Sequence, residues 1–208
     1  MNLHRNRLHP AFTIVELLVV ISVISVLISI ILPTMAASRE SARRVVCLNN
    51  LRSLGLAIQM YQDDHDRALP YANYDYSLPF GWTEPLDALE PYLDVDLPSI
   101  DEHGDIISGQ PFRCPTDPGY CDQIGISYSY YPSMFMGVAS PERSEQAIAK
   151  DVTMRFYERG GSRWPVFRDL GWWHTGSPKS KYAANANALG GPNSLRYDGS
   201  VGWYVDDE

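Results

Sequence analysis

The sequence predicts an α+β protein in which a long, kinked N-terminal helix, membrane-spanning in its first half, packs on a small antiparallel β-sheet head with long loops. Three observations lead to this prediction. An apolar run lies near the N-terminus, an amphipathic stripe follows it, and a strong hairpin signal lies near the C-terminus. The 208 residues fit one domain with an appended helix.

Charge is distributed unevenly along the chain. Residues 1–62 contain 6 basic and 2 acidic side chains, whereas residues 63–208 contain 11 basic and 23 acidic ones. A nucleic-acid-binding surface needs a basic face, so the acidic part argues against nucleic acid as a partner. Hydrophobic residues make up 45% of the chain, which excludes both wholesale disorder and a multi-span membrane protein.

The segment from Leu17 to Leu32 is apolar except for three serines, whose hydroxyls can bond back to their own helix. Extended back to Phe12 it has 21 residues before Pro33. Such a helix is about 31 Å long and can cross a bilayer core. The segment fits a cleaved secretory signal, a plain membrane anchor, or an anchor in which Glu16 has a function. A carboxylate just inside an apolar helix is costly and usually functional, which favours the third interpretation.

The residues around this carboxylate have a familiar order. Pro10-Ala11-Phe12-Thr13-Ile14-Val15-Glu16 followed by an apolar stretch resembles the class III signal of type IV pilins and type II secretion pseudopilins. The resemblance implies that a prepilin peptidase cuts between Ala11 and Phe12, and that the new N-terminus is methylated. It also implies an assembly role for Glu16, the fifth mature residue, which would neutralise the Phe12 amine of another subunit. Ala11 departs from the usual Gly but is also small.

The same resemblance implies a function, a location and partners. It predicts a structural subunit of a type IV pilus-like or type II secretion pseudopilus filament, held in the inner membrane by a single pass. The N-terminus would be cytoplasmic, and the head would be periplasmic or extracellular. The expected partners are prepilin peptidase, other pilin or pseudopilin subunits and the inner membrane, with no nucleic acid.

The alternative function is a membrane-tethered or secreted binding module that recognises glycan or protein through an aromatic-rich head. The aromatic clusters that suggest it are Tyr128, Tyr130 and Tyr131, and Trp172 with Trp173. Aromatic side chains also dominate small β cores, so a core role is the simpler interpretation of these clusters.

Beyond the apolar run the helix is expected to continue. Pro33 predicts a kink, and a stripe with steps of four and three residues predicts an amphipathic helix that ends near Gln62. The stripe consists of Cys47, Leu51, Leu54, Ile58 and Tyr61. The predicted divisions are a leader at 1–11, a transmembrane and assembly helix at 12–33, an amphipathic helix continuing into the head at 34–66, and a β-rich globular head at 67–208.

Later segments resemble a group of bacterial pilin-like proteins, abundant in planctomycetes and verrucomicrobia, that have a C-terminal His-x9-Asp-Gly motif. The matching segments are residues 47–57, 112–117, 127–130 and 190–201. The motif is degenerate in this chain, because Asp198-Gly199 is present and Ala188 occupies the position of the His. A role of that His is therefore absent here or moved, with His174 as the nearest candidate.

The head is expected to contain short strands. Asp198-Gly199 between two alternating runs is typical of a tight hairpin turn in which both central residues have positive φ. Residues 126–131 and 152–157 are predicted as further strands. Ser140-Pro141 predicts the start of a short helix that ends near Lys150.

Three cysteines occur, and an external head permits disulfides. Cys114 and Cys121 are the favoured pair, because they are close in sequence across a loop rich in Pro and Gly. Cys47 paired with Cys114 would instead connect the helix to the head, and three buried thiols are the remaining alternative.

No motif with catalytic mechanics occurs, so we expect a protein that is not an enzyme. The spacing of Cys and His argues against zinc, and we expect no cofactor. Calcium at Asp198, together with the acidic residues 206–208, is a weaker alternative based on their carboxylate oxygens. Asp198 as a turn residue is the simpler interpretation.

Overall fold

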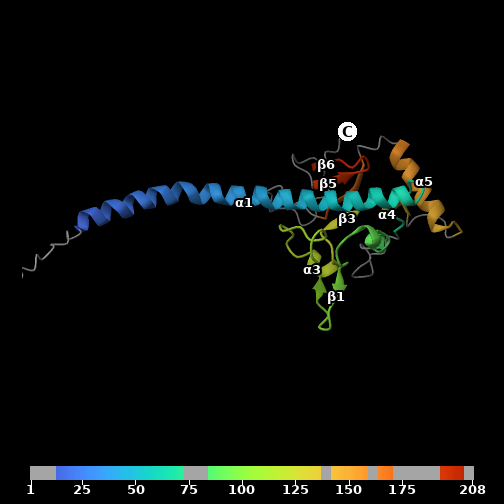
Figure 1. The fold of residues 1–208 in the computed structure, drawn as a ribbon, viewed down its shortest axis with the longest axis horizontal. Coiled ribbons are helices and arrows are strands. Elements are labelled where there is room, and N and C mark those ends of the chain that lie inside the picture. Colours follow the sequence, from blue (N-terminus) through green and yellow to red (C-terminus); the bar gives the residue numbers. More distant parts are fainter. Residues whose placement is uncertain (1–12, 73–83, 137–141, 159–163, 171–192, 204–208) are drawn as a thin grey trace, which may run out of the picture. The chain divides into compact units, whose positions relative to one another are not determined.

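The structure is a computed structural model, and it describes residues 13–72, 84–136, 142–158, 164–170 and 193–203. Contacts divide the chain into two compact units, Met1–Ser41 and Ala42–Glu208. The predicted α+β class is confirmed, since one long N-terminal helix is combined with small antiparallel sheets (Figure 1).

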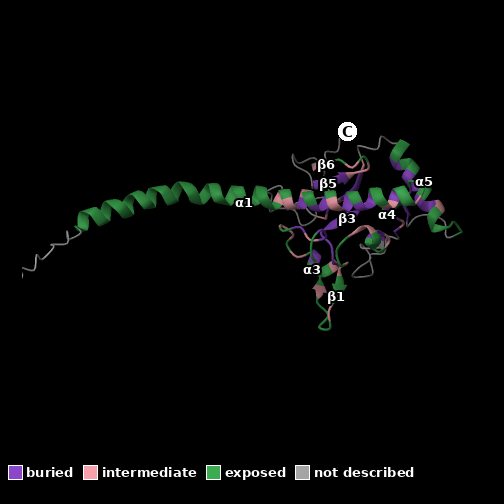
Figure 2. Ribbon diagram, in the orientation of Figure 1, coloured by how far each residue is buried: buried purple, intermediate pink, exposed green. Residues whose placement is uncertain are grey.

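Helix α1 runs from Ile14 to Asp64 and contains Pro33. In the first unit all of its residues are exposed (Figure 2). The three serines of the apolar run donate hydrogen bonds to backbone carbonyls one turn back, at 2.7–2.8 Å, as predicted. The helix ends close to the predicted position, where Asp66 and Arg67 adopt positive φ and the Arg67 amide donates to the Gln62 carbonyl at 2.8 Å.

The second unit contains a four-stranded antiparallel sheet in the order β3-β4-β5-β6. Its strands are β3 (Tyr128–Tyr130), β4 (Pro165–Asp169), β5 (Asn193–Arg196) and β6 (Val201–Trp203). Tyr130 pairs with Phe167, Phe167 with Leu195, and Leu195 with Val201. The predicted strand at 126–131 and the C-terminal hairpin are therefore confirmed.

The hairpin turn differs in detail from the prediction. Gly199 has a φ of 81°, whereas Asp198 is not among the described residues with positive φ. The Gly199 amide donates to the Arg196 carbonyl at 3.0 Å, and the Arg196 amide donates to the Ser200 carbonyl at 2.9 Å. The loop thus has three residues, with a left-handed glycine as the third, and only that position needs positive φ.

The predicted strand at 152–157 is wrong, because these residues form the second half of helix α5, Glu145–Glu158. Ile148, Val152 and Phe156 are buried at intervals of four residues, a helical spacing that outweighs the β-propensity of Val, Thr and Tyr. The helix begins after Ser144, whose hydroxyl accepts the Ala147 amide at 3.3 Å. Ser140 and Pro141 lie outside the described residues.

Shorter elements complete the second unit. They are α2 (Glu84–Leu89), the 3-10 helix η1 (Glu90–Tyr92), β1 (Ser99–Ile100), β2 (Ile106–Ile107), α3 (Cys121–Ile124) and α4 (Ser133–Met136). Strands β1 and β2 form a separate two-stranded hairpin rather than joining the larger sheet.

The core of the second unit lies between α1 and the four-stranded sheet. Four residues of the predicted stripe, Cys47, Leu51, Leu54 and Ile58, are buried, and Tyr61 is half-buried. Gly55 lies directly against the sheet, because a Cβ at this position would come within 2.7 Å of a methyl carbon of Leu195. Glycine therefore permits the close approach of helix and strand.

The favoured disulfide between Cys114 and Cys121 is wrong. Cys114 is bonded to Cys47, with a Cα–Cα distance of 5.1 Å, and Cys121 is a buried free thiol. The Asp117 carboxylate accepts the amides of the next residues, including Cys121 at 2.9 Å, and so folds the loop into the start of α3. Tertiary packing of Cys47 on the buried stripe therefore decides the pairing, and closeness in sequence does not.

Candidate functional site

The first candidate site is the start of α1. The amide and hydroxyl of Thr13 donate to Glu16 Oε2 at 2.8 and 2.7 Å, and the Glu16 amide donates back to the Thr13 hydroxyl at 3.2 Å. This reciprocal arrangement is a capping box, which satisfies amides that a helix start leaves without partners. Sequence reasoning missed it, although the Thr-x-x-Glu spacing is its signal.

The processing residues cannot be placed in the same way. Ala11 and Phe12 lie outside the described residues, so cleavage and methylation stay predictions. Pro33 lies inside α1, and the kink predicted there also stays a prediction.

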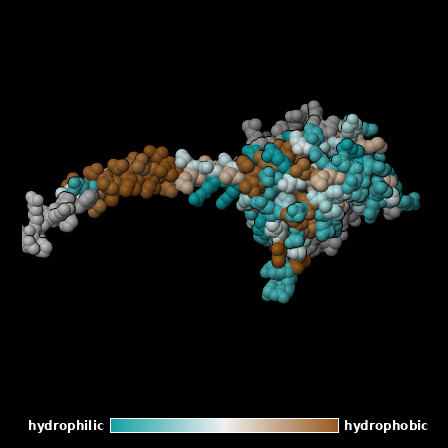
Figure 3. All heavy atoms as spheres, viewed as in Figure 1, coloured by the Kyte–Doolittle hydropathy of each residue, from teal (hydrophilic) through white to brown (hydrophobic). Residues whose placement is uncertain are grey.

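The apolar surface of α1 follows directly after the capping box. Its large apolar side chains from Ile14 to Met35 are between 45% and 83% exposed (Figure 3). By length and composition this helix can cross a membrane, and a signal sequence would satisfy the same criteria. A helix that is apolar all round requires lipid or other apolar helices around it.

A buried polar network links α1 to the sheet within the second unit. Arg44 Nε donates to Asn193 Oδ1 at 3.3 Å, and the Asn193 amide donates to Asp169 Oδ2 at 2.9 Å. Burial raises the pKa of Asp169 to about 8, against the opposing effects of the Asn193 hydrogen bonds and the Arg44 charge. The network fixes the end of β4 relative to β5 and the helix.

The tyrosine cluster is part of the core. Tyr128 and Tyr130 are at most 1% exposed, and Asn50 Nδ2 donates to Tyr128 Oη at 3.1 Å. The remaining member, Tyr131, is half-buried beneath the Arg168 guanidinium, 4.8 Å from its ring centroid. Trp172 and Trp173 lie outside the described residues.

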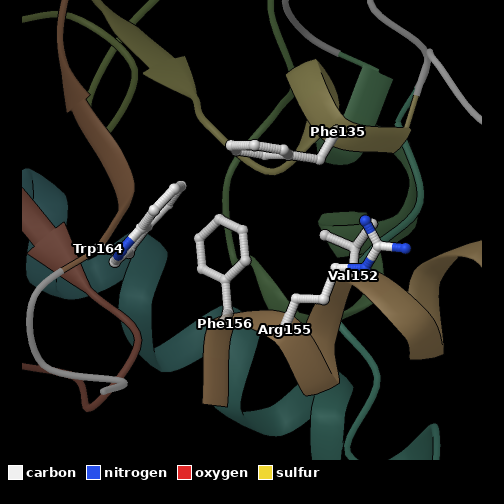
Figure 4. Close-up of a pocket in the computed structure, with 5 residues that line it drawn as sticks. All are labelled: Phe135, Val152, Arg155, Phe156 and Trp164. Atoms are coloured by element: carbon white, nitrogen blue, oxygen red, sulfur yellow. The ribbon is translucent and has the colours of Figure 1, made fainter. Parts of the chain in front are cut away.

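A different aromatic cluster lines a cavity of about 120 Å³ between α4, α5 and the start of β4. The rings of Phe135, Phe156 and Trp164 surround it with centroid separations of 5.4–5.8 Å (Figure 4). Arg155 lies at its edge and forms an ion pair with Asp151 at 2.8 Å. The cavity thus offers apolar ring faces beside one charged donor, Arg155.

The remaining candidates have local structural roles. Asp198 Oδ1 accepts the Ser200 amide at 2.9 Å, as a turn residue does. Among the described residues no group of three or more His, Cys, Asp or Glu is arranged to hold a metal ion. His65 stacks on Tyr61 with ring centroids 3.9 Å apart. His174, Ala188 and residues 206–208 lie outside the described residues.

Comparison with known proteins identifies a family. The model of the family described as "Protein of unknown function (DUF1559)" matches residues 36–200, well over half of the chain. This family is typical of planctomycete pilin-like proteins with the His-x9-Asp-Gly motif. The matched residues begin at 36, after the segment that resembles a prepilin signal, so the match does not test that segment. No curated protein and no solved structure matches the chain. The chain therefore belongs to the DUF1559 family.

Proposed function

We propose that this protein is a structural subunit of a type IV pilus-like or type II secretion pseudopilus filament. In this proposal a prepilin peptidase cuts before Phe12, and the subunit assembles through the first half of α1. The observation that supports it most is the fully exposed apolar surface of that half-helix, with the Glu16 carboxylate at its start.

The apolar surface has two environments in this proposal. Before assembly, α1 lies in the inner membrane with its N-terminus in the cytoplasm. In the filament, the helices pack against one another, which offsets the loss of contacts with lipid. Water is an unfavourable environment for a helix of this composition, so we propose that lipid surrounds it before assembly and other helices surround it afterwards. Its length suits the first of these environments, because it is sufficient to cross a bilayer core.

The charge of Glu16 is the second part of the proposal. Cleavage before Phe12 would create an amine close to the capping box, and Glu16 of a neighbouring subunit would pair with it. Two buried charges are tolerated when they neutralise each other.

The disulfide supports the proposed location of the head. Disulfides form and persist in oxidising compartments, and Cys47–Cys114 closes the second unit onto α1. We therefore place the head in the periplasm or outside the cell. We also propose that the head is not an enzyme and that it binds no cofactor and no nucleic acid.

Two variants separate the assembly role of Glu16 from its capping role. Glu16→Gln retains an acceptor for the Thr13 amide but removes the charge, whereas Thr13→Ala removes the cap hydroxyl and retains the charge. We expect Glu16→Gln to insert into the membrane and to be absent from filaments collected by sedimentation, and Thr13→Ala to be incorporated. Normal incorporation of Glu16→Gln would remove the assembly role.

The aromatic cavity favours a second candidate function, a tethered binding module for glycan. A sugar ring can lie on the faces of Phe135 and Trp164 while one of its hydroxyls accepts a hydrogen bond from Arg155. Binding of the full-length protein to immobilised glycans, compared with Phe135→Ala, tests this function. Glycan binding that requires Phe135, together with normal behaviour of Glu16→Gln, would favour the module over the filament.

A further inference from the structure

Within the second unit, α1 has a second apolar face besides the one that packs on the sheet. Val45, Leu56 and Met60 are 61%, 62% and 52% exposed, and together with Arg52 they recur at helical spacing along one side. We call these four residues the outer strip. In the described part of the chain, no carboxylate forms an ion pair with Arg52. These side chains leave apolar surface on the side of α1 opposite the sheet, where a partner can bind.

The β1–β2 hairpin, residues 99–107, is the second unpartnered element, and we call it the arm. It points away from the four-stranded sheet (Figure 1), and its tip, at the bottom of the view, is hydrophilic, whereas the stem above it is more hydrophobic (Figure 3). Ile100 pairs with Ile106, so both lie on one face, and Ile100 is 52% exposed. A two-stranded hairpin is marginally stable alone, and an exposed apolar face adds to its need for a partner.

The tip of the arm is acidic and well defined. Asp101, Glu102 and Asp105 lie in it, and Asp101 Oδ1 accepts the amides of His103 and Asp105, each at 2.8 Å. The Glu102 side chain is 87% exposed. The arm therefore combines isoleucines with negative charge, whereas the outer strip combines apolar residues with a positive charge.

We infer that the arm of one subunit docks on the outer strip of a second copy of this chain. Ile100 and Ile106 contact Leu56 and its apolar neighbours, while the tip carboxylates approach Arg52. Both surfaces remain exposed within one chain, so the arm does not cover the outer strip of its own subunit. The inference rests on the proposed assembly function and adds to it a contact between heads that does not involve the apolar first half of α1.

Site-specific photo-crosslinking in the full-length, membrane-borne protein tests this contact. A photoreactive residue replaces Ile100, and matched proteins have it at Ile107, on the opposite face of the arm, or at Val23, on the membrane helix. We expect Ile100 to yield covalent dimers whose joined peptides fall within residues 45–60, with little yield from Ile107. Dimers through Val23 report assembly independently.

The outcomes separate the two proposals. If Val23 yields dimers but Ile100 yields no adduct within residues 45–60, the arm contact is overturned and assembly stays in place. The same conclusion holds if Val23 yields dimers and only Ile107 yields such an adduct. An absence of dimers at all three positions counts against both.

Charge exchange provides a second test. Arg52→Glu should lower the Ile100 crosslink about tenfold, because it places like charges opposite each other. Combining it with Glu102→Lys and Asp105→Lys should restore the yield, whereas Glu142→Lys in place of those two changes should not. Equal yields from all these proteins would contradict the role of charge, and with it the proposed register of arm and strip.

Discussion

Removing the Cys47–Cys114 disulfide should destabilise the second unit strongly. The two cysteines are 67 residues apart in sequence, so the bond closes a long loop in the unfolded chain. The chain-entropy relation gives about 4 kcal/mol of unfolding free energy for a loop of this length. Replacing both cysteines by alanine avoids a new free thiol, and the folded core loses little volume because both residues are small.

Urea unfolding of the full-length protein in detergent micelles, followed by tryptophan fluorescence, measures this effect. We expect the double variant to lose about 4 kcal/mol and to show a larger dependence on urea, because its unfolded state is less compact. Cys121→Ala is the matched control, since it removes a buried cysteine outside the disulfide, and it should cost about 1 kcal/mol. Equal losses in both proteins, or peptide mapping that joins Cys114 to Cys121, would refute the reasoning.

Three further predictions concern the same unit. The folded-state pKa of Asp169 of about 8 lies above its ordinary value of 3.8, so the folded state binds the proton more tightly. The contribution of Asp169 to the unfolding free energy should therefore be largest below pH 4 and fall as pH rises to 8, by up to about 1.4 kcal/mol per pH unit. Urea titrations between pH 5 and 8 should show this slope in the wild type and its loss in Asp169→Asn; parallel slopes would contradict the assignment. Gly199→Ala should lower the unfolding free energy by about 1–2 kcal/mol, because φ is 81° and a Cβ would lie 2.5 Å from Gln59 Nε2. Gly109→Ala is the control, since a Cβ there would have no atom within 4 Å, and it should be nearly neutral. Thermal unfolding of both variants measures the difference. Tyr128→Phe should cost about 1 kcal/mol by the same assay, because the hydroxyl donates to the Cys47 carbonyl only at 3.5 Å and Asn50 still donates to the Arg113 carbonyl at 2.8 Å. A loss as large as that of the disulfide variant would contradict this modest role of the hydroxyl.

Elements with a strong local pattern could be predicted from the sequence. The apolar run and the stripe through Leu51 and Leu54 predict α1, because helical periodicity persists over many turns. The alternating runs around Gly199 predict the C-terminal hairpin. In each case the residues that specify the element are neighbours in the chain.

Features set by distant contacts could not be predicted in this way. The pairing of Cys47 with Cys114 depends on which side of α1 meets the loop, and the loop itself is shaped by Asp117. The β-branched and aromatic residues in the second half of α5 predict a strand there, but Val152 and Phe156 are spaced for a buried helical face, and packing of that face decides in favour of helix.

In the candidate sites, too, features set by neighbouring residues could be predicted, whereas features set by distant contacts could not. The position of Glu16 at the start of the apolar helix could be predicted from the sequence. Its bond to Thr13 was not predicted, although the Thr-x-x-Glu spacing is typical of a capping box. The aromatic cavity was missed because Phe135, Phe156 and Trp164 come from three separate segments. In the predicted aromatic cluster, Tyr128 and Tyr130 are core residues, as their burial shows.

The central claim is that this chain is processed as a prepilin before assembly. Intact-mass measurement and identification of the N-terminal peptide in the native protein test it most directly. We expect a chain that begins at methylated Phe12. A start near Ala37 would contradict it in favour of an ordinary secretory signal, and an intact Met1 would leave a simple membrane tether.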